Sequence, residues 1–302
     1  MINRDLYINL SDSFYGGRLI ETEWQNDHFL KLLDDDSPEI QKIIRSTLLS
    51  NSLEIILNGF VHRLQLEEYY FGLLQKHLKE IHFELVKQAF EEFLRSQLED
   101  VDLEKAMMLL AYWNNPDVKV PEVIARLDQM SEEIGKNFPE SGHPLSFIDH
   151  INFYLFNKFG FQGNSGDYYN PDNSFIDKVL ENCQGIPITL SALYMLIARR
   201  LGLPVHGIPM PAHFIVKYET DNDEIFFDPF FAGKIYSREE CLNYLDQTKI
   251  EDKDRILEGC SNYEMILRMM RNIHLVYSSY KEDPQKTAEI EILMGLLEGH
   301  FK

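Results

Sequence analysis

The fold is decided by residues 185–204, which read GIPITLSALYMLIARRLGLP. Nearly every residue that follows Pro187 is apolar, so a helix formed here has no polar face and has to be buried. The ends carry ordinary helix signals, with Pro187 in the first turn, Arg199 and Arg200 in the last turn, and Gly202 just beyond. The sequence therefore predicts a buried helix at the centre of a domain.

Two strands are predicted after this helix. Residues 214–218 (FIVKY) and 225–227 (IFF) flank a polar turn, which is the pattern of an antiparallel hairpin. Ala212-His213-Phe214 opens the first strand, and Asp228 closes the second. If the turn centres near Asp221, His213 faces a position within a residue or two of Asp228, and cross-strand Cβ atoms lie about 5 Å apart. The spacing thus predicts that the two side chains meet.

A His oriented by an Asp is the general base of many thiol hydrolases. Cys183, four residues before Pro187, is the one thiol that could serve it, because a helix N-terminus favours a thiolate. A thiol near a domain core is more often an inert small hydrophobe. Thr189 and Ser191 are the other candidate nucleophiles. They lie in the helix, where hydroxyls commonly bond back to the preceding turn instead of reacting.

Helical patterns flank this region on both sides. From about Leu30 to Leu127, apolar residues recur at intervals of three and four. The acidic run at 34–39 is predicted to be a helix start, with Ser37 as N-cap and Pro38 as the first helical residue. It also resembles the start of a HEAT-type repeat, without a second copy. A helix followed by a long ordered loop is predicted across 137–173.

The C-terminal part is also predicted to be helical. The helical pattern returns at about Ser237, and two helices near 263–280 and 284–297 are expected to form an αα-hairpin. Cys241 and Cys260 fall on predicted helices without a His near them in sequence, so a structural role is expected for both.

Composition excludes several classes of function. The 302 residues carry a net charge of −20, which opposes binding to nucleic acid or to an anionic membrane. Residues 1–5 do not resemble the start of a signal peptide, and no apolar run is long enough to cross a bilayer, so a cytoplasmic location is expected. Three scattered cysteines indicate reduced thiols. No metal-binding motif is present, and no cofactor is expected.

The order of helix, His and Asp resembles the transglutaminase-like superfamily, and more closely its bacterial SirB-one type branch. The resemblance rests on five segments in the same order: YNPDNSF at 169–175, GIPITLS at 185–191, RRLGLP at 199–204, AHF at 212–214 and DPF at 228–230. It covers about residues 101–245, and the helical tail is similar to that branch's tetratricopeptide-like end.

The resemblance implies an α+β fold with a papain-like core, in which the buried helix packs on an antiparallel sheet. All-helical residues 1–100 are expected to precede the core at 101–245, and a helical tail at 246–302 to follow it. His213 then takes the general-base position and Asp228 its orienting partner. Tyr169, Asn173, Pro187 and Thr189 are expected to line the cleft.

The resemblance also locates a missing group. In catalytic members the Cys lies fifteen residues before the Gly that follows the central helix, and that position here is Pro187. Proline supplies no nucleophile. Two functions follow as hypotheses. The first is a non-catalytic module that binds a protein or peptide, as yet unknown, or regulates it. The second is an atypical cysteine amidase, peptidase or acyl-transferase that uses Cys183 with His213 and Asp228.

Overall fold

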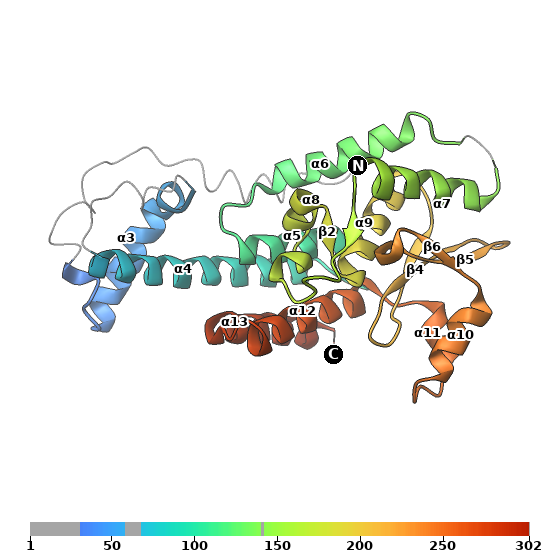
Figure 1. The fold of residues 1–302 in the computed structure, drawn as a ribbon. Helices are drawn as coiled ribbons and strands as arrows, with labels where there is room; N and C mark the ends of the chain where they lie inside the picture. Colours follow the sequence, from blue (N-terminus) through green and yellow to red (C-terminus); the bar gives the residue numbers. More distant parts are fainter. Residues whose placement is uncertain (1–30, 58–67, 140–141, 302) are drawn as a thin grey trace. The chain divides into compact units, whose positions relative to one another are not determined.

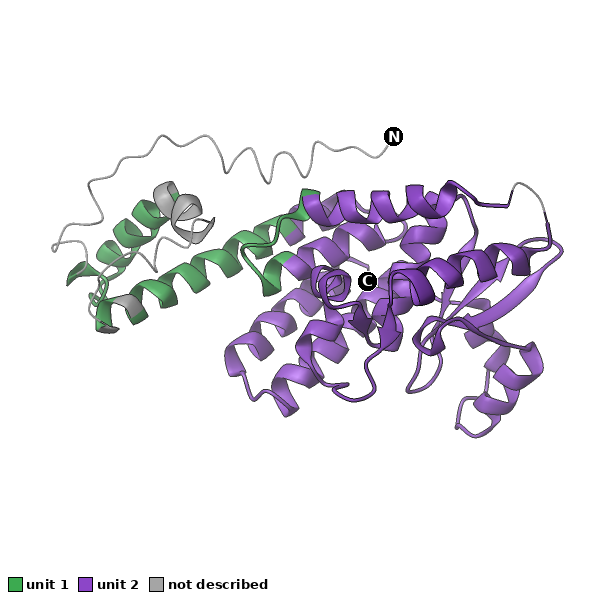
Figure 2. Cartoon of the chain, turned by 45° about the horizontal axis from the view of Figure 1, so that its top comes forward, with its two compact units in different colours: residues 1–89, 112–121 green, residues 90–111, 122–302 purple. Residues whose placement is uncertain are grey.

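The computed structural model describes residues 31–57, 68–139 and 142–301. The chain forms two compact units, one of residues 1–89 and 112–121 and the other of residues 90–111 and 122–302 (Figure 2). We refer to them as unit 1 and unit 2. The first five residues, from which no signal peptide is expected, lie outside the described residues, as does Leu30. In the described part of the chain, none of the helices has the length and apolar character needed to span a membrane.

Unit 1 is helical, as the sequence predicts. It contains α3 (Pro38–Leu57) and most of α4 (Glu68–Arg95). Pro38 is the first residue of α3, which confirms the predicted helix start, and the carboxylate of Asp35 accepts a 2.8 Å hydrogen bond from the Ser37 amide. A small apolar core lies between these elements: Leu33, Ile44, Leu48, Leu74, Leu78 and Ile81. The HEAT-like character stays a prediction.

Unit 2 is built around α9 (Pro187–Arg200), drawn near the middle of Figure 1. The predicted helix is confirmed at both ends: Pro187 is its first residue, and Gly202 beyond it has a positive φ of 74°. Eleven of its residues are buried: Pro187, Ile188, Thr189, Leu190, Ser191, Ala192, Leu193, Tyr194, Leu196, Ile197 and Ala198. Without a polar face, this helix is stable only inside a core.

One face of α9 packs on a four-stranded antiparallel sheet with the strand order β3-β4-β5-β6. The strands are β3 (Val205–Ile208), β4 (Ile215–Glu219), β5 (Glu224–Asp228) and β6 (Lys234–Tyr236). The ring of Tyr194 on the helix meets the ring of Phe227 on β5 edge to face, 4.8 Å apart. The sheet and the helix therefore share one apolar core, and the fold class is α+β.

The predicted hairpin is confirmed as β4 and β5, with Val216 opposite Phe227. One boundary is wrong: β4 begins at Ile215 and not at Ala212-His213. The reason is a tight turn from Met210 to His213, closed by a 3.2 Å bond from the His213 amide to the Met210 carbonyl. His213 therefore lies at the end of a turn, two residues before the strand.

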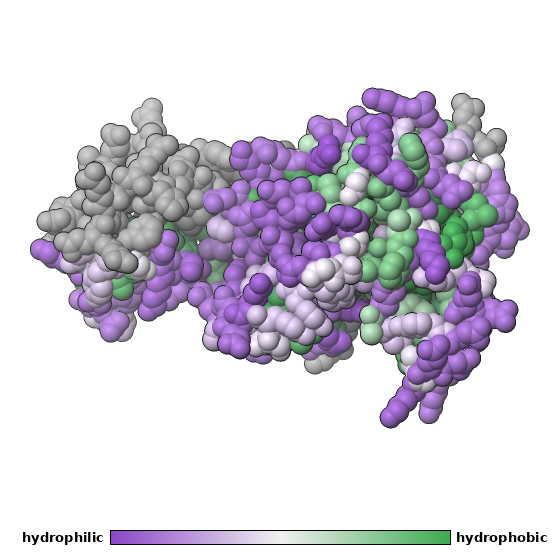
Figure 3. Space-filling model, viewed as in Figure 1, coloured by the Kyte–Doolittle hydropathy of each residue, from purple (hydrophilic) through white to green (hydrophobic). Residues whose placement is uncertain are grey.

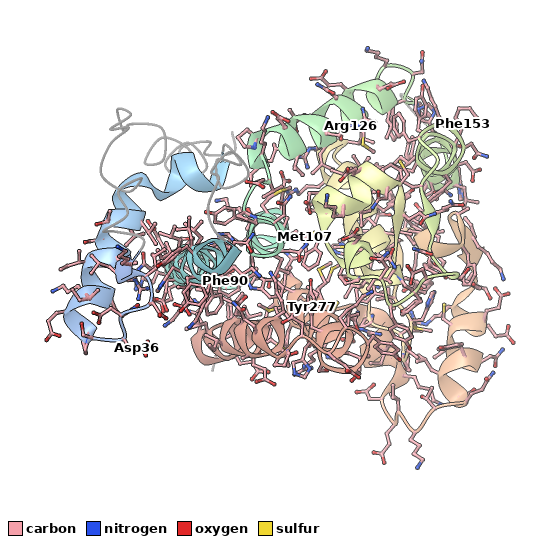
Figure 4. All side chains as sticks on the ribbon, turned by 60° about the vertical axis from the view of Figure 1, so that its left-hand side comes forward. Asp36, Phe90, Met107, Arg126, Phe153 and Tyr277 are labelled. Carbon is pink, nitrogen blue, oxygen red and sulfur yellow. The ribbon has the colours of Figure 1, made fainter. Side chains whose placement is uncertain are left out.

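The loop region between the first helices of unit 2 and α9 contains more structure than predicted. It runs through α7 (Pro144–Asn152), a π-helical turn η2 (Phe153–Lys158), a short 3₁₀ turn η3 (Pro171–Ser174) and α8 (Ile176–Asn182). Two short strands, β1 (Gln162–Gly163) and β2 (Gln184–Gly185), pair in parallel. Figure 4 labels Phe153 at the start of η2, where 58% of this side chain is exposed.

Further helices of unit 2 come before and after the sheet and α9 in the chain. They are α5 (Leu103–Asn114) and α6 (Val120–Gly135), whose ends reach into unit 1, and then α10 (Arg238–Asp246) and α11 (Lys253–Glu258). The last two helices, α12 (Asn262–Ser279) and α13 (Pro284–His300), pack as the predicted αα-hairpin. Domain boundaries at 100 and 245 stay a prediction.

Candidate functional site

The structure brings His213 and Asp228 together, as the hairpin spacing predicts. Nε2 of the imidazole lies 2.6 Å from Oδ2 of the carboxylate. The side chain of Asp228 is fully buried, whereas 21% of the His213 side chain is exposed. The pair thus has a buried carboxylate behind an imidazole that reaches the surface. Their predicted catalytic role stays a prediction.

Asp228 is held in place by backbone groups on its C-terminal side. It ends β5 and caps the 3₁₀ turn η4 (Pro229–Phe231), because its Oδ1 accepts a 2.9 Å bond from the Phe230 amide. The Asp228 carbonyl accepts a 2.8 Å bond from the Gly233 amide. With one carboxylate oxygen bound to backbone and the other to His213, the orientation of the imidazole is fixed.

Aromatic rings surround the imidazole. The ring centres of Phe230 and Phe231 lie 6.0 Å and 5.9 Å from that of His213, and Phe231 is 57% exposed. Tyr168, 36% exposed, meets Phe230 at 6.5 Å. With Nε2 bound to Asp228, Nδ1 of His213 has no hydrogen-bond partner within the described ranges. Phe230 and Phe231 are site residues that no sequence pattern indicates, although they follow directly after the Asp228-Pro229 motif.

The nucleophile position offers no reactive group. Pro187 is buried in the first turn of α9. The Thr189 hydroxyl is also buried, and it donates a 2.6 Å bond to the Asn173 carbonyl and accepts a 3.1 Å bond from the Ile186 amide. Ser191 has no exposed surface. The Thr189 hydroxyl therefore caps the helix start, and the buried Ser191 hydroxyl has no hydrogen-bond partner among the described residues.

Cys183 lies at the end of α8 in the left-handed region, with a φ of 53°. Its backbone carbonyl accepts a 3.0 Å bond from the Gln162 amide, which extends the pairing of β1 and β2. The side chain is half-buried, and among the residues that the structure covers its thiol makes no hydrogen bond to His213. A role as nucleophile stays a prediction.

The thiols of the other two cysteines have raised pKa values. Burial raises the pKa of the Cys241 thiol to about 11 and that of the Cys260 thiol to about 12. Both thiols are therefore protonated at physiological pH, and a protonated thiol is a poor nucleophile. The structural role expected for them stays a prediction, and one placement is wrong, because Cys260 lies between α11 and α12 and not on a helix.

Asn173 supports the loop that leads to α9. Its side-chain amide donates to the carbonyls of Asp167 (2.7 Å) and Tyr168 (3.2 Å), and its carbonyl oxygen accepts from Asn164 (3.0 Å). Only 3% of the residue is exposed, so these bonds satisfy a buried amide. Tyr169, in contrast, is 39% exposed and stacks on Tyr280 of the tail at 3.6 Å. Lining of a cleft by these residues stays a prediction.

One further residue of the site comes from the helical tail. Arg268 on α12 donates from Nη2 to the backbone carbonyls of Met210 (2.8 Å) and His213 (2.6 Å). No sequence signal pointed to it, because the contact joins residues far apart in the chain. Across the described segments, no group of three or more potential metal ligands comes together.

Comparisons with known proteins give the family. The family model described as the transglutaminase-like superfamily matches residues 121–271, half of the chain. A UPF0162 protein of Xylella fastidiosa (strain Temecula1 / ATCC 700964) is 35% identical over 135 residues, which are 43% of this chain and 48% of that protein. A UPF0162 protein of Vibrio cholerae is 33% identical over 85 residues, covering 28% of this chain and 31% of that protein.

A eukaryotic protein is similar over a longer stretch. F-box only protein 21 of Homo sapiens is 29% identical over 226 residues, which are 64% of this chain and 35% of that protein. The chain thus spans about half the length, or less, of these curated relatives. No solved structure matches it. The match to the family model, together with the buried helix, the sheet and the paired His213 and Asp228, shows that the chain belongs to the transglutaminase-like superfamily.

Proposed function

We propose that unit 2 is a non-catalytic transglutaminase-like module that binds a peptide segment of a partner protein at the surface around His213. The observation that carries the proposal is a complete His213–Asp228 pair in a unit whose central helix starts without a nucleophile. Pro187 stands at the position where catalytic relatives carry Cys, and the Thr189 hydroxyl is bonded to backbone. A general base without a nucleophile cannot start covalent catalysis.

The surface around the pair suits peptide recognition. Exposed Phe231 and Tyr168 offer apolar contact, and rigid aromatic rings lose little conformational entropy on binding. Nδ1 of His213 is available as a hydrogen-bond partner for a backbone amide. Figure 3 shows hydrophobic residues (green) on the visible face of unit 2, in the region where Figure 1 draws α7, β5 and β6. Exposed apolar patches of this kind mark interaction sites.

The net charge of −20 favours a partner segment without strong negative charge. Such a segment would lay apolar side chains on the aromatic rings and direct one backbone group at the imidazole. The function is then regulation by binding, in which occupancy of this surface by a partner is the signal.

An array of random-sequence synthetic peptides tests the proposal. Purified full-length protein is applied to the array as wild type, as His213→Ala, as Phe231→Ala, and as the control Leu275→Ala, an exposed apolar residue on α12. The affinity of each peptide that binds is then measured in solution by fluorescence anisotropy. Its molecular mass is determined by mass spectrometry after incubation with the protein.

The proposal expects peptides that bind the wild type and the control equally and that bind both site variants on the order of tenfold more weakly, which corresponds to the loss of one well-packed contact. The peptide masses should stay unchanged. Peptides that bind all four proteins equally would contradict the proposed site. Cleavage or acyl transfer that is lost in Cys183→Ser would instead support the cysteine enzyme.

A further inference from the structure

His213 is presented by a turn in a strained conformation. The turn runs from Met210 to His213, and its third residue, Ala212, has a positive φ of 53°. Turns with Pro second and a positive φ third usually carry Gly or Asn at the third position, because a Cβ atom crowds the backbone there. A strained residue of this kind persists only where surrounding contacts hold it.

Two side chains from the C-terminal helices supply such contacts. Arg268 of α12 donates from one nitrogen to the carbonyls of Met210 (2.8 Å) and His213 (2.6 Å). Tyr244 of α10 donates its hydroxyl to the Pro211 carbonyl at 2.7 Å. Three of the four carbonyls in the turn therefore accept a bond from outside it.

The environment of Arg268 is unusual for an arginine. The side chain is half-buried, and within the described residues it forms no salt bridge. Its charge is instead met by the carbonyls of Met210 and His213 and by the Phe214 ring, whose centre lies 5.5 Å from the guanidinium carbon. Burial lowers the pKa of Arg268 from its ordinary value, although an arginine stays charged in proteins. Burying a charged side chain costs free energy unless hydrogen bonds compensate for the lost water.

The packing below Arg268 leaves the turn little freedom. The Phe214 ring lies so close to Gly207 on β3 that a Cβ atom at this glycine would be 2.7 Å from it. Phe214 is thus fixed between β3 and the guanidinium of Arg268. His213 directly precedes Phe214, and Arg268 contacts the carbonyl of the first and the ring of the second. These contacts hold the backbone from which the imidazole extends, and so set where it points.

We infer that Arg268 is the positioning residue of the site: it holds the Met210–His213 turn so that the imidazole meets Asp228 and keeps Nδ1 toward a ligand. The ligand part of this inference rests on the proposed peptide binding. The positioning part does not, because it concerns the unliganded protein. The helical tail is accordingly a component of the site.

The test is nuclear magnetic resonance of the ¹⁵N-histidine-labelled full-length protein without ligand. The proton on Nε2 of His213, hydrogen-bonded to Asp228, is assigned by its absence from His213→Ala. Its position and lifetime are compared in the wild type, Arg268→Met, Arg268→Lys, and the control Arg271→Met. Arg271 lies on the same helix, 63% exposed, and pairs with Glu298 at the surface. Thermal unfolding is recorded for every variant.

The inference expects the Nε2 proton signal of Arg268→Met to shift and to exchange faster with water, that of Arg268→Lys to change less in the same direction, and that of Arg271→Met to match the wild type. An unchanged signal in Arg268→Met, with only a lower unfolding temperature, would overturn the inference and leave Arg268 a general stabilising residue. Should Arg268→Met not fold, Arg268→Lys decides, and an unchanged signal there overturns it equally. Peptide affinity is measured separately, so failure of the proposed binding is distinguishable.

Discussion

Replacement of Gly163 by Ala tests the close contact between β1 and the η4 turn that holds Asp228. Gly163 lies on β1 with an ordinary backbone conformation, so alanine is tolerated by the backbone itself. A Cβ atom at this position would lie 2.6 Å from two carbons of the Phe230 ring and 2.7 Å from the Phe230 carbonyl oxygen. The ring could rotate away, but the carbonyl belongs to η4 and moves only with the backbone.

The magnitude follows from two contributions. Overpacking of a close contact costs about 1–3 kcal/mol. If the movement of η4 also lengthens the bond from the Phe230 amide to Asp228, a charged hydrogen bond of about 1.5–3 kcal/mol weakens as well. A partial loss of that bond gives a total of about 2–4 kcal/mol, reduced by the smaller entropy of the unfolded chain that any Gly→Ala change brings, about 0.4–1 kcal/mol.

A matched control removes the entropy contribution. Gly166 lies in the following loop and is exposed, and a Cβ atom added there would meet no other atom within 4 Å, so Gly166→Ala changes only the unfolded chain. Urea unfolding followed by circular dichroism should place Gly163→Ala below Gly166→Ala in free energy of unfolding by about 2–4 kcal/mol. Equal values for the two variants would refute the tight contact between β1 and η4 and its link to Asp228.

Three further predictions concern the turn and the thiols. Ala212→Gly should leave the free energy of unfolding unchanged or raise it by up to about 1 kcal/mol, because glycine adopts the positive φ without strain. A loss of more than about 1 kcal/mol in urea unfolding would be inconsistent with a strained turn. Native protein at slightly alkaline pH should react with a maleimide first at Cys183, since Cys241 and Cys260 are protonated, and peptide mapping that finds Cys260 modified first would count against their burial. Burial raises the pKa of Cys241 to about 11, from an ordinary value near 9, so the folded state binds more protons than the unfolded state between these pH values. The free energy of unfolding should therefore fall as pH rises through this range. The fall should be less steep in Cys241→Ala.

The parts of the fold that follow from local pattern could be predicted. The helix at 187–200 has no polar face and has standard signals at both ends, and its observed limits match. The β4–β5 hairpin follows from two apolar runs around a polar turn, and its register brings the start of β4, next to His213, close to Asp228. In both cases the determining contacts are close in sequence.

Parts of the site that depend on distant contacts could not be predicted. Arg268 reaches the His213 carbonyl from a helix more than fifty residues further along the chain, and nothing in its own surroundings in the sequence indicates that contact. The sequence pattern predicts the start of β4 too early, because the Ala212 conformation breaks the strand and alanine gives no signal for a positive φ. The parallel pairing of β1 with β2 involves only four residues, too few to show a period.

The most direct test of the central claim is the reactivity of Cys183 toward iodoacetamide at mildly acidic pH, compared between the wild type and His213→Ala, with Asp228→Ala as a second probe of the pair. The claim is that His213 and Asp228 form an intact pair without a nucleophile to activate. It predicts equal rates of Cys183 modification in all three proteins, since an unassisted thiol does not depend on the imidazole. A rate that drops on the order of tenfold or more in both variants would show an activated thiolate and would contradict the non-catalytic account.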